Sequence, residues 1–130
     1  FYKQGSKLRG IKNRIAQQID IMPSILTYLN FDEEYIAFGN NLLDDSFESF
    51  AFNTSGSTYH LYMKDHILEM IENKPVGMFN YKKDIFLENN LIGKNPGLQM
   101  QMEEKLRAII QTYNSRLIDN NMIVRNQHNR

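Results

Sequence analysis

The sequence contains no cysteine, and this absence excludes several kinds of chemistry. A chain without cysteine forms no disulfide, has no thiolate nucleophile and builds no cysteine–zinc site. Zero cysteine suits a reducing cytosol, but it also suits many exported bacterial proteins. The cysteine count therefore does not determine the compartment.

Long apolar runs and an excess of one charge are also missing. No apolar stretch approaches the roughly 20 residues that a membrane-spanning helix needs, and no signal peptide is visible. Lysine and arginine total 15, as do aspartate and glutamate. A general nucleic-acid binder needs a basic surplus, so we expect no nucleic-acid partner, although a local basic patch remains compatible with this balance.

What is present is enough for one folded domain. The chain has 130 residues, of which 42% are hydrophobic, so it can bury a sizeable core. It begins at Phe1-Tyr2 without a methionine. A trimmed tag is one explanation, but we expect a piece of a longer protein, with Phe1-Tyr2 as the stub of a β-strand whose neighbours are missing.

Apolar spacing predicts a helix, or a loop leading into one, within residues 14–31. Asp20 stands just before the apolar run and is expected to cap the helix start. Pro23 fits the first turn, and Asn30 can end the helix. The residues expected on one apolar face are Ile21, Ile25, Leu26 and Leu29.

Residues 32–46 are expected to form a loop, with Gly39-Asn40-Asn41 allowing positive φ angles. The apolar period then changes to two, which predicts four short strands in an antiparallel meander. The strands are expected in "FESFAFN", "TYHLYMK", "HILEMIE" and "VGMFNY", with turns at "TSGS", Lys64-Asp65 and Asn73-Lys74-Pro75.

A long amphipathic helix is expected to follow, with Asn95 as its cap and Pro96 as its first residue. It should run to about Asn120, and "VRNQHNR" should fray. Its apolar stripe is Leu98, Met102, Leu106, Ile109, Tyr113 and Leu117. The predicted fold class is α+β: a four-stranded antiparallel sheet with an N-terminal helix and a C-terminal helix that covers one face of the sheet.

Histidine is the first candidate for metal chemistry, because imidazole is a common ligand. His60 and His66 fall on neighbouring predicted strands and can approach one another, and His128 lies in the tail. No third ligand stands at metal spacing, so surface or satisfied strand histidines are the better interpretation.

Carboxylates, a serine turn and a group of cations are the remaining candidates. Asp32-Glu33-Glu34 and Asp44-Asp45 lack the alternating ligands and central glycine of a calcium loop, so we interpret them as solvated acidic turns. Ser55-Gly56-Ser57 lacks the context of an activated serine. The cations that can form a basic patch for an anion, or simply charged loop ends, are Lys7, Arg9, Lys12, Lys82 and Lys83. Spacing alone therefore identifies no catalytic residue and no metal ligand.

The stretch "MFNYKKDIFLENNL", residues 78–91, is more particular. It resembles the C-terminal signature of the sulfatase family: an aromatic and polar run, a charged pair, an aspartate, and an Asn-Leu ending. Lys82-Lys83-Asp84 matches the charged pair and aspartate, and Asn89-Asn90-Leu91 matches the ending. Ile85 stands where the family usually has proline. Physically, Asp84 can accept backbone N–H groups in a turn, while Asn90 holds the return loop and Leu91 anchors in the core.

Two further segments resemble the same superfamily, in the same order. "RIAQQIDIMPSILTYLNF" is similar to a family segment with Asp, Pro and Thr at the positions of Asp20, Pro23 and Ser24. Asn30 replaces the family's usual glycine. "FGNNLLD", residues 38–44, resembles the Phe-Gly segment that follows. With the terminal helix, the pattern looks most like the lipoteichoic-acid-synthase-like phosphoglycerol transferases and covers nearly the whole chain.

This resemblance implies a C-terminal subdomain of an enzyme of the alkaline phosphatase superfamily. Such enzymes cleave sulfate or phosphate esters with a metal-bound nucleophile. The nucleophile and metal motifs lie upstream of this chain in the family. The resemblance therefore transfers no catalytic, metal or substrate-binding role to any residue here, and the chain alone should be inactive. Manganese, magnesium or calcium is implied for the parent enzyme only.

The resemblance also implies partners, boundaries and location. Residues 1–130 would form one unit, with 1–31 ending the catalytic α/β domain and 46–120 forming the sheet and helix. The implied partner is the upstream catalytic domain, with no direct membrane contact by this chain. The implied location is the extracytoplasmic face of a bacterial inner membrane. The alternative is a free-standing binding or scaffolding module, whose interface would be the aromatic residues Phe50, Phe52, Tyr59, Tyr62, Phe79 and Tyr81.

Overall fold

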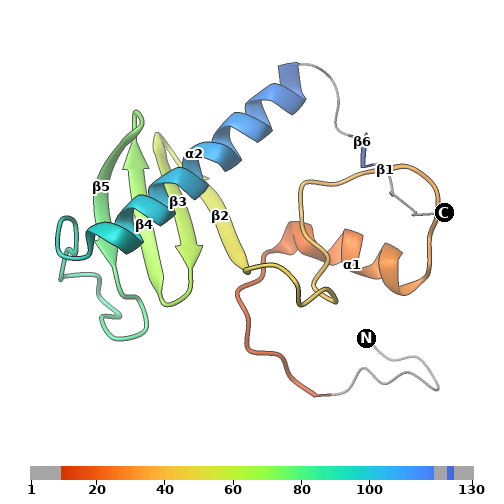
Figure 1. Cartoon of the computed structure of the whole chain (residues 1–130), viewed down its shortest axis with the longest axis horizontal. Coiled ribbons are helices and arrows are strands. Elements are labelled where there is room, and N and C mark those ends of the chain that lie inside the picture. The colour runs from red at the N-terminus through yellow and green to blue at the C-terminus, as the bar shows by residue number, and fades with distance from the viewer. Residues whose placement is uncertain (1–9, 119–122, 125–130) are drawn as a thin grey trace.

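A computed structural model describes residues 10–118 and 123–124 of the chain (Figure 1). The fold is α+β, with a short N-terminal helix, a four-stranded antiparallel sheet and a long C-terminal helix that packs on the sheet. The elements in chain order are η1 (Gln18–Asp20), α1 (Ile21–Tyr28), β1 (Tyr35–Ile36), β2 (Phe50–Ser55), β3 (Thr58–Met63), β4 (His66–Ile71), β5 (Lys74–Phe79), α2 (Pro96–Ile118) and β6 (Ile123–Val124).

The sheet is the predicted meander, with strand order β2-β3-β4-β5 and every neighbouring pair antiparallel. Gly56 supplies a positive φ of 59° in the β2–β3 turn. The last turn differs from the prediction, because it consists of Glu72-Asn73, with φ angles of 46° and 66°. Two successive positive φ angles match the twist of a tight hairpin. Pro75 consequently belongs to β5, where an edge strand tolerates its missing N–H.

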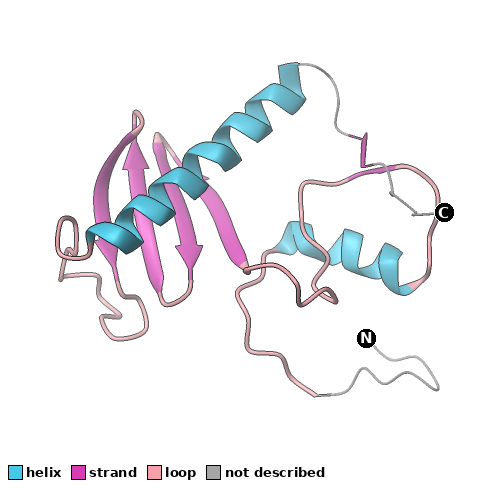
Figure 2. Ribbon diagram, in the orientation of Figure 1, coloured by secondary structure: helices cyan, strands magenta, loops and turns pink. Residues whose placement is uncertain are grey.

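The main core lies between one face of this sheet and the first half of α2. Figure 2 shows α2 running diagonally across the strands. Fully buried side chains from both layers meet here, and they are Leu61, Met63, Leu68, Met70, Met78, Met102 and Leu106. Four of the seven are methionines, whose flexible side chains fill irregular gaps between a twisted sheet and a helix.

Helix α2 begins as expected, since Asn95 Oδ1 accepts the N–H of Leu98 at 3.3 Å. The predicted apolar stripe is only half buried. Met102 and Leu106 are fully buried, whereas Tyr113 and Leu117 are 44% and 48% exposed. The cause is geometric, because the second half of α2 extends past the edge of the sheet (Figure 1).

The N-terminal helix is shorter than the predicted segment and ends where expected. Asn30 has a φ of 54°, the left-handed conformation that terminates helices. The apolar face expected from Ile21, Ile25, Leu26 and Leu29 is not fully covered, because Ile21 and Leu29 are 47% and 63% exposed. Burial in α1 falls instead on Pro23 and Ser24.

A two-stranded ladder that the sequence did not predict joins β1 to β6, pairing Tyr35 with Val124 and Ile36 with Ile123. This ladder brings the chain after α2 back to the N-terminal segment. The proposed strand stub Phe1-Tyr2 and the expected helix end near Asn120 lie outside the described residues.

Candidate functional site

The first segment that carries the resemblance is organised around a buried carboxylate. Asp20 is 1% exposed. Its Oδ2 accepts the backbone N–H of Gln17 at 2.9 Å, and its Oδ1 accepts that of Asn40 at 2.7 Å. No side-chain cap bond reaches α1. The prediction that Asp20 caps α1 is therefore wrong: its carboxylate closes the turn before the helix and binds the loop that follows β1.

Ser24 and Gly39 complete this junction, in which the first and second matched segments lie against each other. The Ser24 hydroxyl donates to the carbonyl of Asp20 at 2.6 Å and accepts the N–H of Leu42 at 2.8 Å. A Cβ at Gly39 would overlap the backbone carbonyl of Ile19. Gly39 does not use the positive φ that glycine allows; glycine is needed here for close backbone approach.

The third matched segment forms a loop that returns along the outer edge of β5. Asn90 Oδ1 accepts the N–H of Met78 at 3.2 Å, and its Nδ2 donates to the carbonyl of Val76 at 3.2 Å. The N–H of Leu91 donates to the carbonyl of Met78 at 2.7 Å, and Leu91 packs against the core. These bonds confirm the predicted roles of Asn90 and Leu91 and cover an edge that would otherwise expose unpaired backbone groups.

Asp84 shapes the tip of the same loop. Its Oδ2 accepts the N–H of Asn89 at 2.7 Å, as predicted. Backbone hydrogen bonding from Asn89 is the main reason why the pKa of Asp84 lies below its ordinary value of 3.8. The next two side chains point into solvent, since Ile85 and Phe86 are 73% and 78% exposed.

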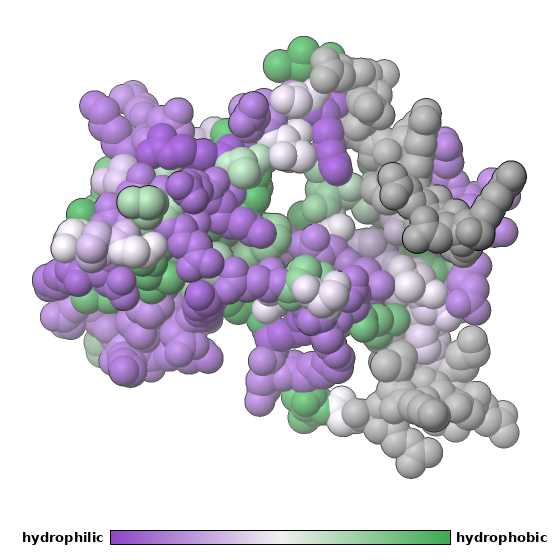
Figure 3. All heavy atoms as spheres, viewed as in Figure 1, coloured by the Kyte–Doolittle hydropathy of each residue, from purple (hydrophilic) through white to green (hydrophobic). Residues whose placement is uncertain are grey.

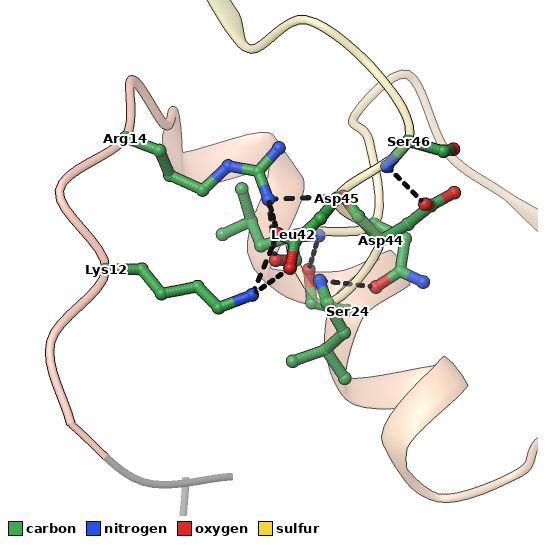
Figure 4. Close-up of polar contacts among 9 residues, drawn as sticks. Lys12, Arg14, Ser24, Leu42, Asp44, Asp45 and Ser46 are labelled. Carbon is green, nitrogen blue, oxygen red and sulfur yellow. Dashed lines mark hydrogen bonds and ion pairs between the residues drawn. The ribbon is translucent and has the colours of Figure 1, made fainter.

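Within the acidic pair Asp44-Asp45, Asp45 binds two cationic side chains. Lys12 Nζ lies 2.6 Å from a carboxylate oxygen of Asp45, and Arg14 Nη1 lies 3.2 Å from the other (Figure 4). Hydrogen bonding from Lys12 lowers the pKa of Asp45. Asp44 instead accepts the N–H of Ser46 at 2.8 Å. Asp45 therefore ties the chain before η1 to the loop before β2.

The candidate basic patch does not assemble among the described residues. Lys12 pairs with Asp45, and Lys82 lies 2.6 Å from the carboxylate of Asp65. Lys7 and Arg9 lie outside the described residues. The interpretation as charged loop ends fits these contacts better than an anion site does.

The two described histidines occupy separate places in the sheet. His60 pairs across the ladder with Glu69, and its Nε2 lies 3.6 Å from that carboxylate. His66 Nε2 lies 3.4 Å from Nδ2 of Asn80. In the register His66 stands opposite Met63, three positions from His60, and an odd offset places the two side chains on opposite faces. The expectation that they can approach one another is therefore wrong, and His128 lies outside the described residues.

No group of three metal-ligating side chains occurs among residues 10–118 and 123–124. Ser55 ends β2, and Gly56-Ser57 forms the following turn, so this serine is not at a strand-to-helix elbow. No helix in the described part of the chain is long and apolar enough to cross a membrane.

The aromatic residues of the meander divide between the two faces of the sheet. Phe50, Phe52 and Tyr59 line a pocket of about 590 Å³ beneath the second half of α2. Tyr62 makes an edge contact with Tyr81 over 5.8 Å between ring centroids, in a wider groove on the opposite face. The aromatic side chains thus do not form one interface.

The pocket under α2 is a concave site that the sequence did not predict. Its walls come from α2, from β2 and β3, and from the segment around η1 and Phe38. Gln17 fixes this segment on the sheet, since its Oε1 accepts the N–H of Phe52 at 3.0 Å. The only signal in the sequence was the continuation of the apolar stripe of α2 beyond the residues that the sheet can cover.

Comparison with known proteins does not test the resemblance to the sulfatase family, which stays an expectation. Neither a protein-family model nor a curated protein matches this chain.

Proposed function

We propose that this chain is the C-terminal subdomain of a metal-dependent sulfatase or phosphoglycerol-transferase-like enzyme. In this proposal the chain packs on an upstream catalytic domain and helps to shape its cleft. The ester-cleaving chemistry belongs to that domain. The described residues do not fit a metal centre, so no catalytic step is assigned to them.

The observation that carries the proposal is the apolar surface of the N-terminal segment. Around η1, α1 and β1, large apolar side chains are between 40% and 63% exposed, and they are Ile19, Ile21, Met22, Leu29, Phe31 and Ile36. In the same segment, the buried side chains of Asp20 and Ser24 form hydrogen bonds with the backbone. A segment with ordered polar contacts but an uncovered apolar surface is typical of a part that packs on another domain.

The three matched segments support the same proposal through their structural roles. Asp20, Ser24 and Gly39 join the first two segments, and Asn90 and Leu91 join the third to β5. The residues that carry the resemblance are therefore those that the local structure requires. A location on the extracytoplasmic face of a bacterial membrane, as part of a tethered parent, belongs to the same proposal.

The size of the native protein in its source cells tests this proposal. An antibody raised against the chain is used to blot membrane and soluble fractions. A membrane-associated band several times larger than 15.3 kDa is expected. A soluble band at the mass of the chain itself would overturn the proposal.

A second assay tests the absence of chemistry in this part. The purified chain, supplied with manganese or magnesium, should not cleave generic sulfate or phosphate esters above a metal-only blank. Reproducible turnover would contradict the assignment of all catalytic groups to another domain.

The second candidate is a free-standing binding module without catalysis. Two observations favour it: residues 50–118 close a core of their own, and the pocket under α2 is open. The soluble 15.3 kDa band in the blot would select this candidate.

A further inference from the structure

The pocket under α2 has the size and lining of a small-molecule site. Its volume of about 590 Å³ falls within the range of roughly 300–1,000 Å³ that is usual for such sites. Figure 3 shows an open gap between the atoms of α2 and those of the loop that follows β1. The site is therefore open to solvent, while the core beside it is closed.

The charges around the pocket all have one sign. Two cations, Lys105 and Arg116, line it, and no aspartate or glutamate does. Neither cation forms an ion pair with a carboxylate within the described part of the chain. The lack of a carboxylate partner distinguishes Lys105 and Arg116 from Lys12 and Lys82, each of which forms an ion pair with an aspartate. An anion is the complementary occupant.

The two cations bracket an elongated apolar space. They are eleven positions apart on α2, which corresponds to about three turns and about 16 Å, so they project from the same side of the helix. Ile109 and Tyr113 line the pocket between them. The complementary molecule is long, apolar along its body and anionic.

The aromatic wall favours an alkyl body over a stacked base. Phe52 and Tyr59 stack on each other with ring centroids 6.1 Å apart, and Phe38 contacts Tyr113 at 5.2 Å. These rings already have partners within the protein. An alkyl chain packs against such a wall without a stacking geometry of its own.

The two cations differ in how far they are already engaged. Lys105 Nζ lies 4.7 Å from the centroid of the Phe50 ring, so its charge faces a π system. Arg116 donates one long hydrogen bond of 3.4 Å to the carbonyl of Ala37. Its guanidinium retains further N–H groups in the fork that suits carboxylate or phosphate oxygens.

We propose that this pocket binds a single-chain amphiphile with a carboxylate or phosphate headgroup. The headgroup binds Arg116, and the alkyl chain lies along Ile109 toward Phe50. The stem of Lys105 covers the far end of the alkyl chain. The site is separate from the ester chemistry of the proposed parent and is compatible with both candidate functions.

Calorimetric titration of the full 130-residue chain tests this proposal. The probes are decanoate, decyl phosphate, uncharged decyl maltoside and inorganic phosphate, each below micelle-forming concentration. One or both alkyl anions should bind, and the tighter one identifies the headgroup. The uncharged probe should bind at least about tenfold more weakly, in keeping with the loss of a charge-assisted hydrogen bond. Inorganic phosphate should not bind, because it has no alkyl chain.

Matched variants on α2 separate the pocket from general detergent binding. Arg116→Gln should weaken anion binding about tenfold, and Ala108→Trp, at an exposed position on the pocket rim, should block it. Arg107→Gln removes a cation from the same helix outside the pocket and should leave binding unchanged. Circular dichroism confirms that each variant folds. Equal affinity in Arg116→Gln and Arg107→Gln, tight binding of the uncharged probe, or no binding of either anion would overturn the proposal.

Discussion

Asp20 accepts the backbone N–H of Asn40 over 2.7 Å, although 20 positions separate the two residues. The same carboxylate accepts the N–H of Gln17. One buried side chain thus holds the turn before α1 and the loop after β1 in a single arrangement. An ionised acceptor makes stronger hydrogen bonds than a neutral one, which suits a carboxylate at a place where two segments meet.

Replacing Asp20 with alanine should destabilise the fold by about 3 kcal/mol, because two partly buried N–H groups lose their shared carboxylate acceptor. Urea unfolding measures the change, and hydrogen exchange at Asn40 locates it. Asp32→Ala, which removes an exposed carboxylate from the neighbouring loop, should change stability by no more than about 0.5 kcal/mol. Equal effects of the two variants would show that the Asp20 contacts contribute nothing.

Gly39→Ala should cost about 2 kcal/mol or more, since its Cβ would overlap the rigid carbonyl of Ile19. The matched control is Gly97→Ala, where nothing lies within 4 Å of the added Cβ. Because Gly97 is helical, this control should stabilise the chain by up to about 1 kcal/mol. Thermal unfolding of both variants gives the comparison, and a neutral result at Gly39 would refute the close-approach argument.

Asn90→Ala should destabilise the sheet edge by about 1–2 kcal/mol, because Met78 N–H and Val76 C=O lose their partner. Hydrogen exchange at Met78 should accelerate as the return loop detaches. Glu88→Ala, in the same exposed loop, is the control and should leave that exchange rate unchanged. Protection that persists in Asn90→Ala would contradict the edge-covering role.

The loop tip should respond to acid. The pKa of Asp84 is lowered below 3.8, chiefly by the N–H of Asn89. A depressed pKa in the folded state means that the carboxylate stabilises the fold above its unfolded pKa. This contribution is lost as the pH falls below about 4 through the folded value. NMR titration should give Asp84 a midpoint below 3.8, and Asp84→Asn should flatten this part of the stability profile. A midpoint at or above the ordinary value would contradict the hydrogen-bond assignment.

The exposed apolar surface around α1 should make the isolated chain self-associate. Met22→Ser combined with Leu29→Ser should reduce association, because the two side chains are 46% and 63% exposed in this surface. Sedimentation velocity over a concentration series measures the change. Val76→Ser removes an exposed side chain on β5, away from this surface, and should have little effect. Association unaltered in the double variant would argue against a docking surface here.

Local pattern was sufficient for the sheet and for the start of α2. Alternating apolar residues predicted the meander because successive strand side chains point to opposite faces. Asn95-Pro96 predicted the start of α2 because capping and the fixed φ of proline act within one turn. Asn30, Asp84 and Asn90 were also placed correctly, since each acts within its own turn or on the strand just before it.

Local sequence patterns did not predict the contacts between segments that are far apart in the chain. The role of Asp20 depends on Asn40, and that of Gly39 depends on the carbonyl of Ile19. The pocket between α2 and the sheet exists only because α2 runs past the sheet edge. Binding residues such as Arg116 therefore carried no recognisable local signal.

Local sequence patterns specify the α+β class, the order of the strands in the meander and the start of α2. These follow from periodicity, capping and backbone preference, which act over a few residues. Tertiary structure alone decided which apolar faces are covered, which glycine is sterically required and where a pocket forms. Each of these depends on distances between segments far apart in the chain, and packing sets those distances.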